Sequence, residues 1–254
     1  MIEHSSPKVV SREKEFWNER SETGYDRVRS LIGRSIGGFS SYNELHKLYD
    51  PSGLDVLDYG CGRGPGALRL CRNGARHVTG FDISEAEVDE ARALMAEEGY
   101  GDRSTFLVCD AHATPFEDNQ FDLVVGDGIL HHLNVEKALK EIRRILKRGS
   151  AAYFVEPMVH NPILRMGRAL TPTARTEDEH PFTEADWRTC AQVFPNFEHF
   201  ERELITIPLM PLNLALPERH QRRMAQAVHA WDRRLMARAP RLRKYARLTF
   251  LTLR

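Results

Sequence analysis

Cysteine and long apolar runs are both scarce in this 254-residue sequence. Only four cysteines occur, and no two of them have C-x-x-C spacing, so neither a disulfide framework nor a cysteine-based zinc site is expected. The longest charge-free apolar stretch, residues 204–217, has 14 residues with three prolines, whereas a membrane-spanning helix needs about 20 apolar residues. Residues 1–14 are polar and lack the apolar core of a signal peptide. We therefore expect a cytoplasmic protein.

Neither charge is in excess, because 36 Lys and Arg balance 36 Asp and Glu. The balance hides an asymmetry, since residues 217–254 hold 11 basic and two acidic residues. Within this segment, residues 217–245 predict a basic amphipathic helix that either packs on the rest of the protein or contacts a membrane surface. Nucleic-acid binding is disfavoured, because Trp231 and Tyr245 are the only aromatic residues in the helical stretch and the remainder of the chain is acidic.

The middle of the chain alternates short apolar runs with amphipathic ones. Helices are predicted at 67–73, at 84–98 behind a Ser84 cap, and at 135–147 behind an Asn134 cap and before Gly149. Apolar strands separated by helices indicate a parallel sheet covered on both faces. The predicted strands of this doubly wound α/β core are 54–58, 77–82, 104–110, 121–127 and 149–156.

The flanks complete the predicted architecture. Apolar runs at 200–209 and 246–253 predict two further strands, which would give a seven-stranded, mostly parallel sheet with an antiparallel edge. We expect one structural domain in three parts, namely an N-terminal helical cap (1–50), a cofactor-binding core (51–156) and the remainder of the sheet with substrate-cap insertions at 157–182 and 208–243 (157–254).

A glycine-rich turn follows the first predicted strand, in the run from Val56 to Gly64 (VLDYGCGRG). Glycines let the backbone approach a ligand closely, although a tight strand–helix turn without a ligand is the alternative. Asp82 lies at a distance along the chain that suits a ribose-binding acid. A nicotinamide dinucleotide fits less well, because the glycines do not follow G-x-G-x-x-G and the Asp58 carboxylate would oppose a pyrophosphate. A ligand bearing an ammonium and a sulfonium would suit that carboxylate.

These segments resemble the motifs of the class I S-adenosylmethionine-dependent methyltransferases. The resemblance covers about residues 50–156 and implies a Rossmann-like fold with S-adenosyl-L-methionine as cofactor. Arg148 replaces the proline of the family's Leu-Lys-Pro-Gly turn. The matching segments, in order, are 56–64, Asp82, 109–111, 121–133 and 146–149.

The resemblance also implies which residues bind the cofactor. By that similarity Gly60, Gly62 and Gly64 lie against the methionine moiety, Asp58 orients it, Asp82 binds the ribose hydroxyls, Ile83 lies under the adenine, Asp110 and Ala111 bind the adenine edge, and Asp127 faces the substrate or the amino group.

A histidine or carboxylate near the end of the fourth strand could assist proton removal from the acceptor, and the sequence leaves open whether a general base is needed. We expect His131 to face the cleft as that base and His132 to lie in the core. Asp127 and His160 are the other predicted catalytic residues, and Glu156, with the loop residues Asn161, Arg175 and His180, lies in the same region.

No metal is expected. Some family members bind a divalent metal through Glu-x-x-Glu-His at this position, but here Gly128 and His131 replace the two glutamates. A zinc-like arrangement of His131, His132 and His160 is the alternative.

The leading hypothesis is a methyltransferase for an O or N nucleophile, with C-methylation open, on a small-molecule acceptor. The alternatives are a macromolecular acceptor (tRNA or protein), a lipid-like acceptor at a membrane surface, a non-catalytic binding protein and a Rossmann oxidoreductase. A non-catalytic protein would have no physical need for both Asp82 and Asp110.

Overall fold

The computed structural model describes residues 6–19, 42–162, 165–166, 169, 179–206, 209, 212 and 215–254. The helices of this part of the chain are α1 (Pro7–Glu19), α3 (Tyr42–Leu45), α4 (Pro65–Arg72), α5 (Glu85–Glu97), α6 (Val135–Ile145), α8 (Glu184–Val193) and α10 (Glu218–Arg238), with the 3-10 helices η1 (Gly101–Arg103), η2 (Leu130–His132) and η4 (Pro240–Tyr245). The strands are β1 (Asp55–Tyr59), β2 (His77–Asp82), β3 (Ser104–Val108), β4 (Phe121–Asp127), β5 (Leu146–Pro157), β6 (Glu198–Arg202) and β7 (Leu248–Leu253).

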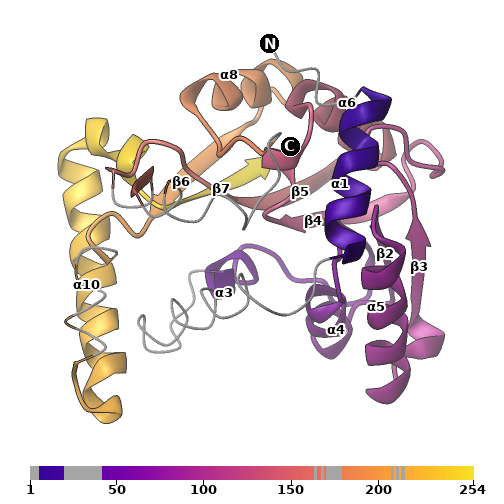
Figure 1. Ribbon diagram of the computed structural model, residues 1–254, viewed down its shortest axis with the longest axis horizontal. Helices are drawn as coiled ribbons and strands as arrows, with labels where there is room; N and C mark the ends of the chain where they lie inside the picture. The colour runs from indigo at the N-terminus through magenta and orange to yellow at the C-terminus, as the bar shows by residue number, and fades with distance from the viewer. Residues whose placement is uncertain are drawn as a thin grey trace.

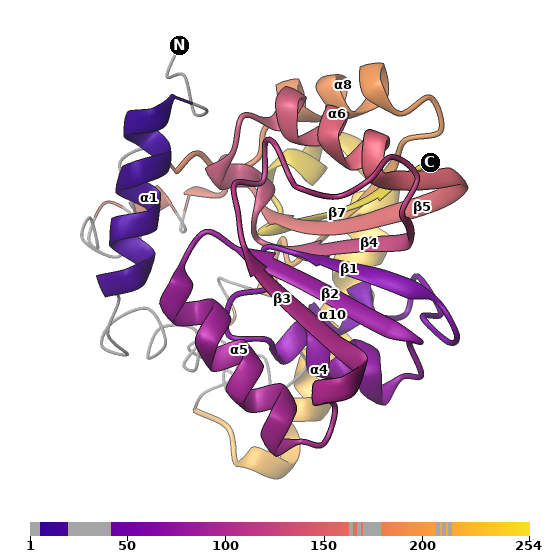
Figure 2. The same cartoon turned by 90° about the vertical axis from the view of Figure 1, so that its right-hand side faces the viewer.

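The seven strands form one sheet in the order β3-β2-β1-β4-β5-β7-β6. Strands β1 to β5 pair in parallel, and β7 is antiparallel to both β5 and β6. Helices α4 and α5 cover one face, and α6 and α8 cover the other (Figure 2). The predicted doubly wound, seven-stranded, mostly parallel fold is confirmed.

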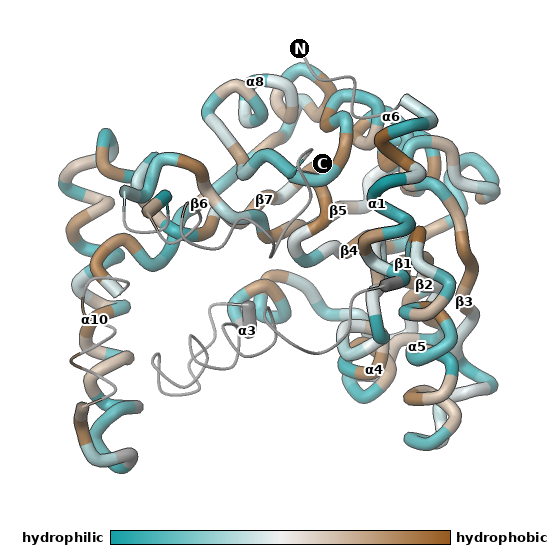
Figure 3. The backbone as a smooth tube through the Cα atoms, in the orientation of Figure 1, coloured by the Kyte–Doolittle hydropathy of each residue, from teal (hydrophilic) through white to brown (hydrophobic). Residues whose placement is uncertain are grey.

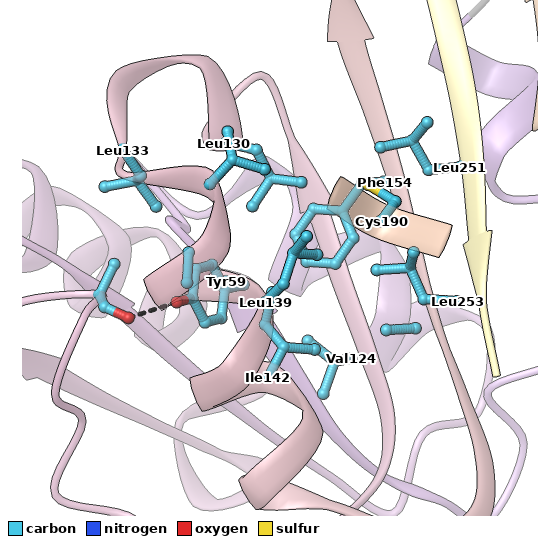
Figure 4. Packing of buried hydrophobic residues seen from close by; sticks show 14 of the residues in the cluster. Tyr59, Val124, Leu130, Leu133, Leu139, Ile142, Phe154, Cys190, Leu251 and Leu253 are labelled. Carbon is cyan, nitrogen blue, oxygen red and sulfur yellow. Dashed lines mark hydrogen bonds between the residues drawn. The ribbon is translucent and has the colours of Figure 1, made fainter. Parts of the chain in front are cut away.

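Two hydrophobic clusters, one on each face of the sheet, make up the core. Strand β5 shows how the sequence supplies both. Phe154 packs towards α6 and α8, whereas its neighbours Tyr153 and Val155 pack on the side of α4 and α5. Such side-chain alternation explains why the central strands are apolar throughout. Figure 4 shows the first cluster, in which α6 residues Leu139 and Ile142 lie against Phe154.

The predicted helix caps are present. The Ser84 hydroxyl accepts the Glu87 backbone N–H at 3.2 Å, and the Asn134 side chain accepts from Lys137 at 3.0 Å. Thr183 and Asp186 form a reciprocal capping box at α8. These side chains satisfy backbone donors that the first helical turn leaves unpaired.

Several predicted boundaries differ from the structure, and two of the differences have a clear physical reason. Helix α6 ends at Ile145 and not beside Gly149, because Leu146 already pairs with Phe121 as the first residue of β5. The strand predicted at 200–209 is β6, which runs from 198 to 202. Beyond it, the N–H groups of 204 and 205 are taken by the Asp232 carboxylate of α10 and not by a neighbouring strand.

Helix α10 stands at the β6 edge of the molecule, at the opposite end from α5 (Figure 1). Hydrophilic and apolar residues alternate along its length (Figure 3). Asp232 and His229 are buried, whereas Trp231 is 64% exposed. No described helix is long and apolar enough to cross a membrane. Much of the predicted cap, including 20–41 and 170–178, lies outside the described residues.

Candidate functional site

A cavity of about 260 Å³ opens at the carboxyl ends of β1, β2 and β4. This is the edge of a parallel sheet where ligands bind in doubly wound folds. Helix α1 closes one side of the cavity with Val10, Glu13 and Trp17. Of the residues predicted to bind the cofactor, the cavity is lined by Asp58, Gly60, Gly62, Asp82, Ile83, Asp110, Ala111 and Asp127.

The glycine loop between β1 and α4 forms the floor of the cavity. Gly60 has φ +75°, and a Cβ atom there would lie 2.7 Å from the Ile129 side chain. Only glycine fits this close approach of the two loops. Gly64 does not line the cavity. It has φ +87° and precedes α4 as its N-cap, so its part in the loop is conformational.

Asp82 links the loop to the end of β2. One carboxylate oxygen accepts the Gly62 N–H at 3.0 Å and the other accepts the Ser84 N–H at 3.1 Å. Burial raises the pKa of Asp82, and these backbone donors act in the opposite direction. A carboxylate fixed in this way retains acceptor capacity for ligand hydroxyls, as a ribose-binding acid requires.

Asp58 is the most perturbed acid of the site. Its side chain is buried, and Oδ2 has no hydrogen-bond partner within the described part of the chain. Burial, reinforced by the nearby carboxylates of Asp127 and Asp82, raises the pKa of Asp58 to about 7. A buried carboxylate without a cation is costly, so this wall of the cavity favours a positively charged ligand and opposes a pyrophosphate.

Asp110 is held in place by a residue that the sequence analysis did not identify, His112. The Asp110 carboxylate accepts from the backbone N–H and from Nδ1 of His112, at 2.9 and 2.7 Å. His112 Nε2 accepts the Asn134 N–H at 3.0 Å, which places the proton of the neutral ring on Nδ1. The His112 hydrogen bond lowers the pKa of Asp110, so this acid stays an acceptor.

Ala111, next to Asp110, is fixed from the sheet side. Its carbonyl accepts a hydrogen bond from the Tyr59 hydroxyl (Figure 4). The backbone at the segment predicted to bind adenine is therefore tied to the last residue of β1.

The two histidines of η2 face the opposite way from the prediction. His132 lines the cavity, where its ring meets Trp17 edge-on with centroids 5.6 Å apart. His131 does not line the cavity, and its Nδ1 lies 2.7 Å from a carboxylate oxygen of Glu156. The physical reason is Glu156, which is fully buried at the end of β5 and draws the first ring of the pair towards the sheet.

Glu156 also holds the backbone of the loop after β4. One carboxylate oxygen accepts the N–H groups of Ile129 and Leu130, at 3.2 and 2.9 Å. Burial raises the pKa of Glu156 to about 7, and these donors partly offset the effect. Glu156 therefore positions the loop and lies outside the cavity.

The remaining predicted residues do not meet at this cavity. His160 is half-buried beyond β5 and does not line it. The Asn161 side chain donates to the Tyr245 carbonyl at 2.8 Å, which ties the start of the insertion to η4. The His180 backbone N–H donates to the His131 carbonyl at 3.0 Å. Arg175 lies outside the described residues.

The contribution of α1 was also missed. The N-terminal cap was predicted, but no residue of it was assigned to the site. The signal that could have found it is the helical spacing of Val10, Glu13 and Trp17, which places all three on one face. The Trp17 indole donates to Glu13 at 3.0 Å, four residues back.

Comparison with known proteins shows what this part of the chain is similar to. Residues 56–149 match the family model of a methyltransferase domain. A sterol 24-C-methyltransferase of Gibberella zeae is 37% identical over 105 residues, 41% of this chain and 28% of that protein. A demethylmenaquinone methyltransferase of Lactococcus lactis subsp. lactis is 31% identical over 148 residues, 57% of this chain and 58% of that protein. The chain thus matches less than two thirds of either relative.

The fold comparison extends over nearly the whole chain. The structure of geranyl diphosphate C-methyltransferase from Streptomyces coelicolor A3(2), solved with Mg²⁺, geranyl diphosphate and S-adenosyl-L-homocysteine, has a TM-score of 0.64 at 14% identity and covers 98% of this chain and 97% of that one. By sequence, residues 56–149 are similar to a methyltransferase domain, and by fold the chain is similar to geranyl diphosphate C-methyltransferase over nearly its whole length.

Proposed function

We propose that the protein transfers the methyl group of S-adenosylmethionine to an O, N or C nucleophile of a small molecule. The observation that carries this proposal is the buried Asp58 carboxyl, which faces a cavity whose walls include Asp82 and Asp110 and has an Oδ2 atom without a partner among the described residues. A cationic ligand with a ribose and an adenine satisfies all three acids together.

The chain's own residues would bind and orient the cofactor, which supplies an electrophilic methyl group on a sulfonium. Asp58 provides the negative field for the ammonium and sulfonium region. Asp82 accepts from the ribose hydroxyls, and Asp110, held ionised by His112, accepts from the adenine amino group. Orientation of reactants of this kind can lower a barrier by about 7–11 kcal/mol.

Proton removal is assigned to Asp127. His131 and His160 do not line the cavity, whereas Asp127 lies at the carboxyl end of β4 and lines it. Asp127 is also solvent-exposed, so it can pass an acceptor's proton to water. This assignment replaces His131 as the general base.

A small acceptor suits the dimensions and walls of the site. The cavity of about 260 Å³ is closed on the α1 side by Trp17 and Val10. Its lining residues do not form a broad basic groove of the kind that binds a tRNA backbone. The two curated relatives act, by their names, on a sterol and on demethylmenaquinone, which supports small-molecule biosynthesis as the setting. We place the protein in the cytoplasm.

Direct binding tests the proposal. Isothermal titration with S-adenosylmethionine, S-adenosylhomocysteine and NAD⁺ should give one binding site for the first two ligands and none for the third. The substitution Asp58→Asn should weaken the binding of S-adenosylmethionine more than the control substitution Asp89→Asn, at an exposed position, does. Binding of NAD⁺ without either sulfur ligand would overturn the proposal.

A lipid-like acceptor at a membrane surface is the second candidate, because α10 presents a basic face. Trp231 is 64% exposed, and the arginines 219, 223, 233, 234 and 238 are exposed on the same helix. Each basic side chain near an anionic surface contributes about 1 kcal/mol of attraction. Co-sedimentation with phosphatidylglycerol vesicles should exceed that with phosphatidylcholine and fall in Trp231→Ala. Equal sedimentation with both vesicle types would remove this candidate.

A further inference from the structure

Both histidines of η2 lie beside a third potential metal ligand, Glu179. One ligand atom from each of His131, His132 and Glu179 lies within 4.8 Å of the other two. All three side chains are about nine-tenths buried, with 9%, 10% and 10% of their surface exposed. Buried imidazoles beside a buried carboxylate are much less common than acidic clusters at a protein surface.

The backbone keeps these residues together. The N–H of His180, the residue after Glu179, donates to the His131 carbonyl at 3.0 Å. This bond fixes the segment that carries Glu179 against η2. The carboxylate and the two rings therefore come from two chain segments that are held in register by the main chain.

Glu156 orients the His131 ring for coordination. Nδ1 lies 2.7 Å from Glu156, and Nε2 lies 3.9 Å from a carboxylate oxygen of Glu179. A ring that donates Nδ1–H to a carboxylate presents the lone pair of Nε2, which is the usual carboxylate–histidine–metal arrangement. In a tetrahedral zinc site neighbouring ligand atoms are about 3.3 Å apart, so this pair needs to close by only about half an ångström.

The His132 ring is constrained on its other side. It lies against the His131 ring at an interplanar angle of 41°, with centroids 4.1 Å apart, and contacts Trp17 edge-on. Glu13 of α1 lies 3.5 Å from His132 Nδ1. Both rings are thus held next to one another by neighbours on either side, with carboxylates around them.

We propose that His131, His132 and Glu179 bind a divalent transition-metal ion of the Zn²⁺ type, with Glu156 orienting His131. Two imidazoles and one carboxylate form the donor set of many zinc sites that keep an open position. No metal was predicted from the sequence, and the alternative set of ligands was His131, His132 and His160. In the structure the third potential ligand beside the two histidines is Glu179 and not His160.

This site would extend the proposed methyl transfer, and the following step rests on that proposed function. His132 also lines the cavity, so an ion bound to it would lie at the cavity wall. Its open position could bind an oxygen or nitrogen atom of the acceptor and orient it. Metal binding itself is independent of this step and can be measured without either substrate.

The test uses the full chain, freed of metal by chelation and dialysis. We expect titration with Zn²⁺ to show one tight site, and Co²⁺ to give visible absorption bands typical of four- or five-coordination. His132→Gln and Glu179→Gln should each weaken Zn²⁺ binding at least tenfold. His220→Gln, at an exposed histidine of α10, is the matched control and should bind as the wild type does.

Each outcome is decisive when far-UV circular dichroism shows that the variants are folded. No stoichiometric Zn²⁺ site in the wild type overturns the proposal, as does equal binding by wild type and Glu179→Gln, which would indicate adventitious binding. Glu179 lies outside the sheet and its helices, so this variant keeps the test valid if His132→Gln does not fold. A variant that loses Zn²⁺ binding but still binds S-adenosylhomocysteine shows that the metal site is separate from the cofactor site. A wild-type protein that binds S-adenosylhomocysteine but no Zn²⁺ overturns the metal site and leaves the proposed methyl transfer standing.

Discussion

Replacing Asp58 by asparagine should change how both stability and cofactor affinity depend on pH. In the folded, ligand-free protein the pKa of Asp58 is raised from 3.8 to about 7, mainly by burial. Between these two values the folded state binds a proton that the unfolded chain has released. The free energy of unfolding therefore falls as the pH rises from about 4 to about 7, and it stays low above that range.

The size of the effect follows from the two pKa values. Integrating the linkage relation from pH 5 to pH 8 gives a loss of about 2.5 kcal/mol that is due to Asp58 alone. Glu156, whose pKa burial also raises to about 7, titrates in the same range and adds to the change with pH. The quantity to compare is thus the change between pH 5 and pH 8 in the wild type minus the same change in Asp58→Asn.

Urea denaturation of the ligand-free proteins at both pH values measures this difference. From pH 5 to pH 8, the free energy of unfolding should change by about 2.5 kcal/mol less towards instability in Asp58→Asn than in the wild type. Cofactor affinity should rise with pH in the wild type up to about pH 7, because the cationic ligand requires the ionised carboxylate. In Asp58→Asn that rise should be absent. Parallel pH profiles for the two proteins, in stability and in affinity, would refute the assignment of a protonated, buried Asp58.

Three further predictions concern the walls of the cavity. Asp82→Asn should weaken the binding of S-adenosylhomocysteine roughly tenfold to a hundredfold, because about 1.5–3 kcal/mol of hydrogen bonding is lost. An unchanged affinity in calorimetry would show that the ribose lies elsewhere. Asp127→Asn should lower turnover about a hundredfold or more while cofactor affinity stays within a fewfold, and near-normal turnover would mean that no base is needed at this position. Trp17→Ala should speed cofactor dissociation in stopped-flow measurements, because it removes one wall of the cavity, and an unchanged rate would exclude α1 as a barrier to release.

The sheet and the acids on its carboxyl edge were accessible from sequence, since they depend on local patterns. The runs ending in Asp82 and Asp127 have the predicted boundaries of β2 and β4. Apolar strands and capping residues act over a few neighbours. The position of Asp58 inside the cavity follows from its place at the end of β1.

The assignment of the two histidines failed because it depends on a distant residue. A 3-10 helix such as η2 places consecutive side chains on different faces, but which face meets the cavity is decided by Glu156, 25 residues further along the chain. Helix α6 was extended too far for a similar reason. Its end is fixed by the pairing of Leu146 with Phe121, which local helical periodicity does not reveal.

The docking of α1 has a consequence for how the protein forms during synthesis. Helix α1 precedes every element that it contacts. The Asn18 side chain lies 2.8 Å from the Ser84 hydroxyl, and Trp17 meets His132. A ribosome making this chain releases α1 more than a hundred residues before His132, so the helix has no complete surface to dock on until β4 and η2 have emerged. Helix α1 is therefore synthesised before the other walls of the cofactor cavity, but it can take its final place only after β4 and η2 have been made.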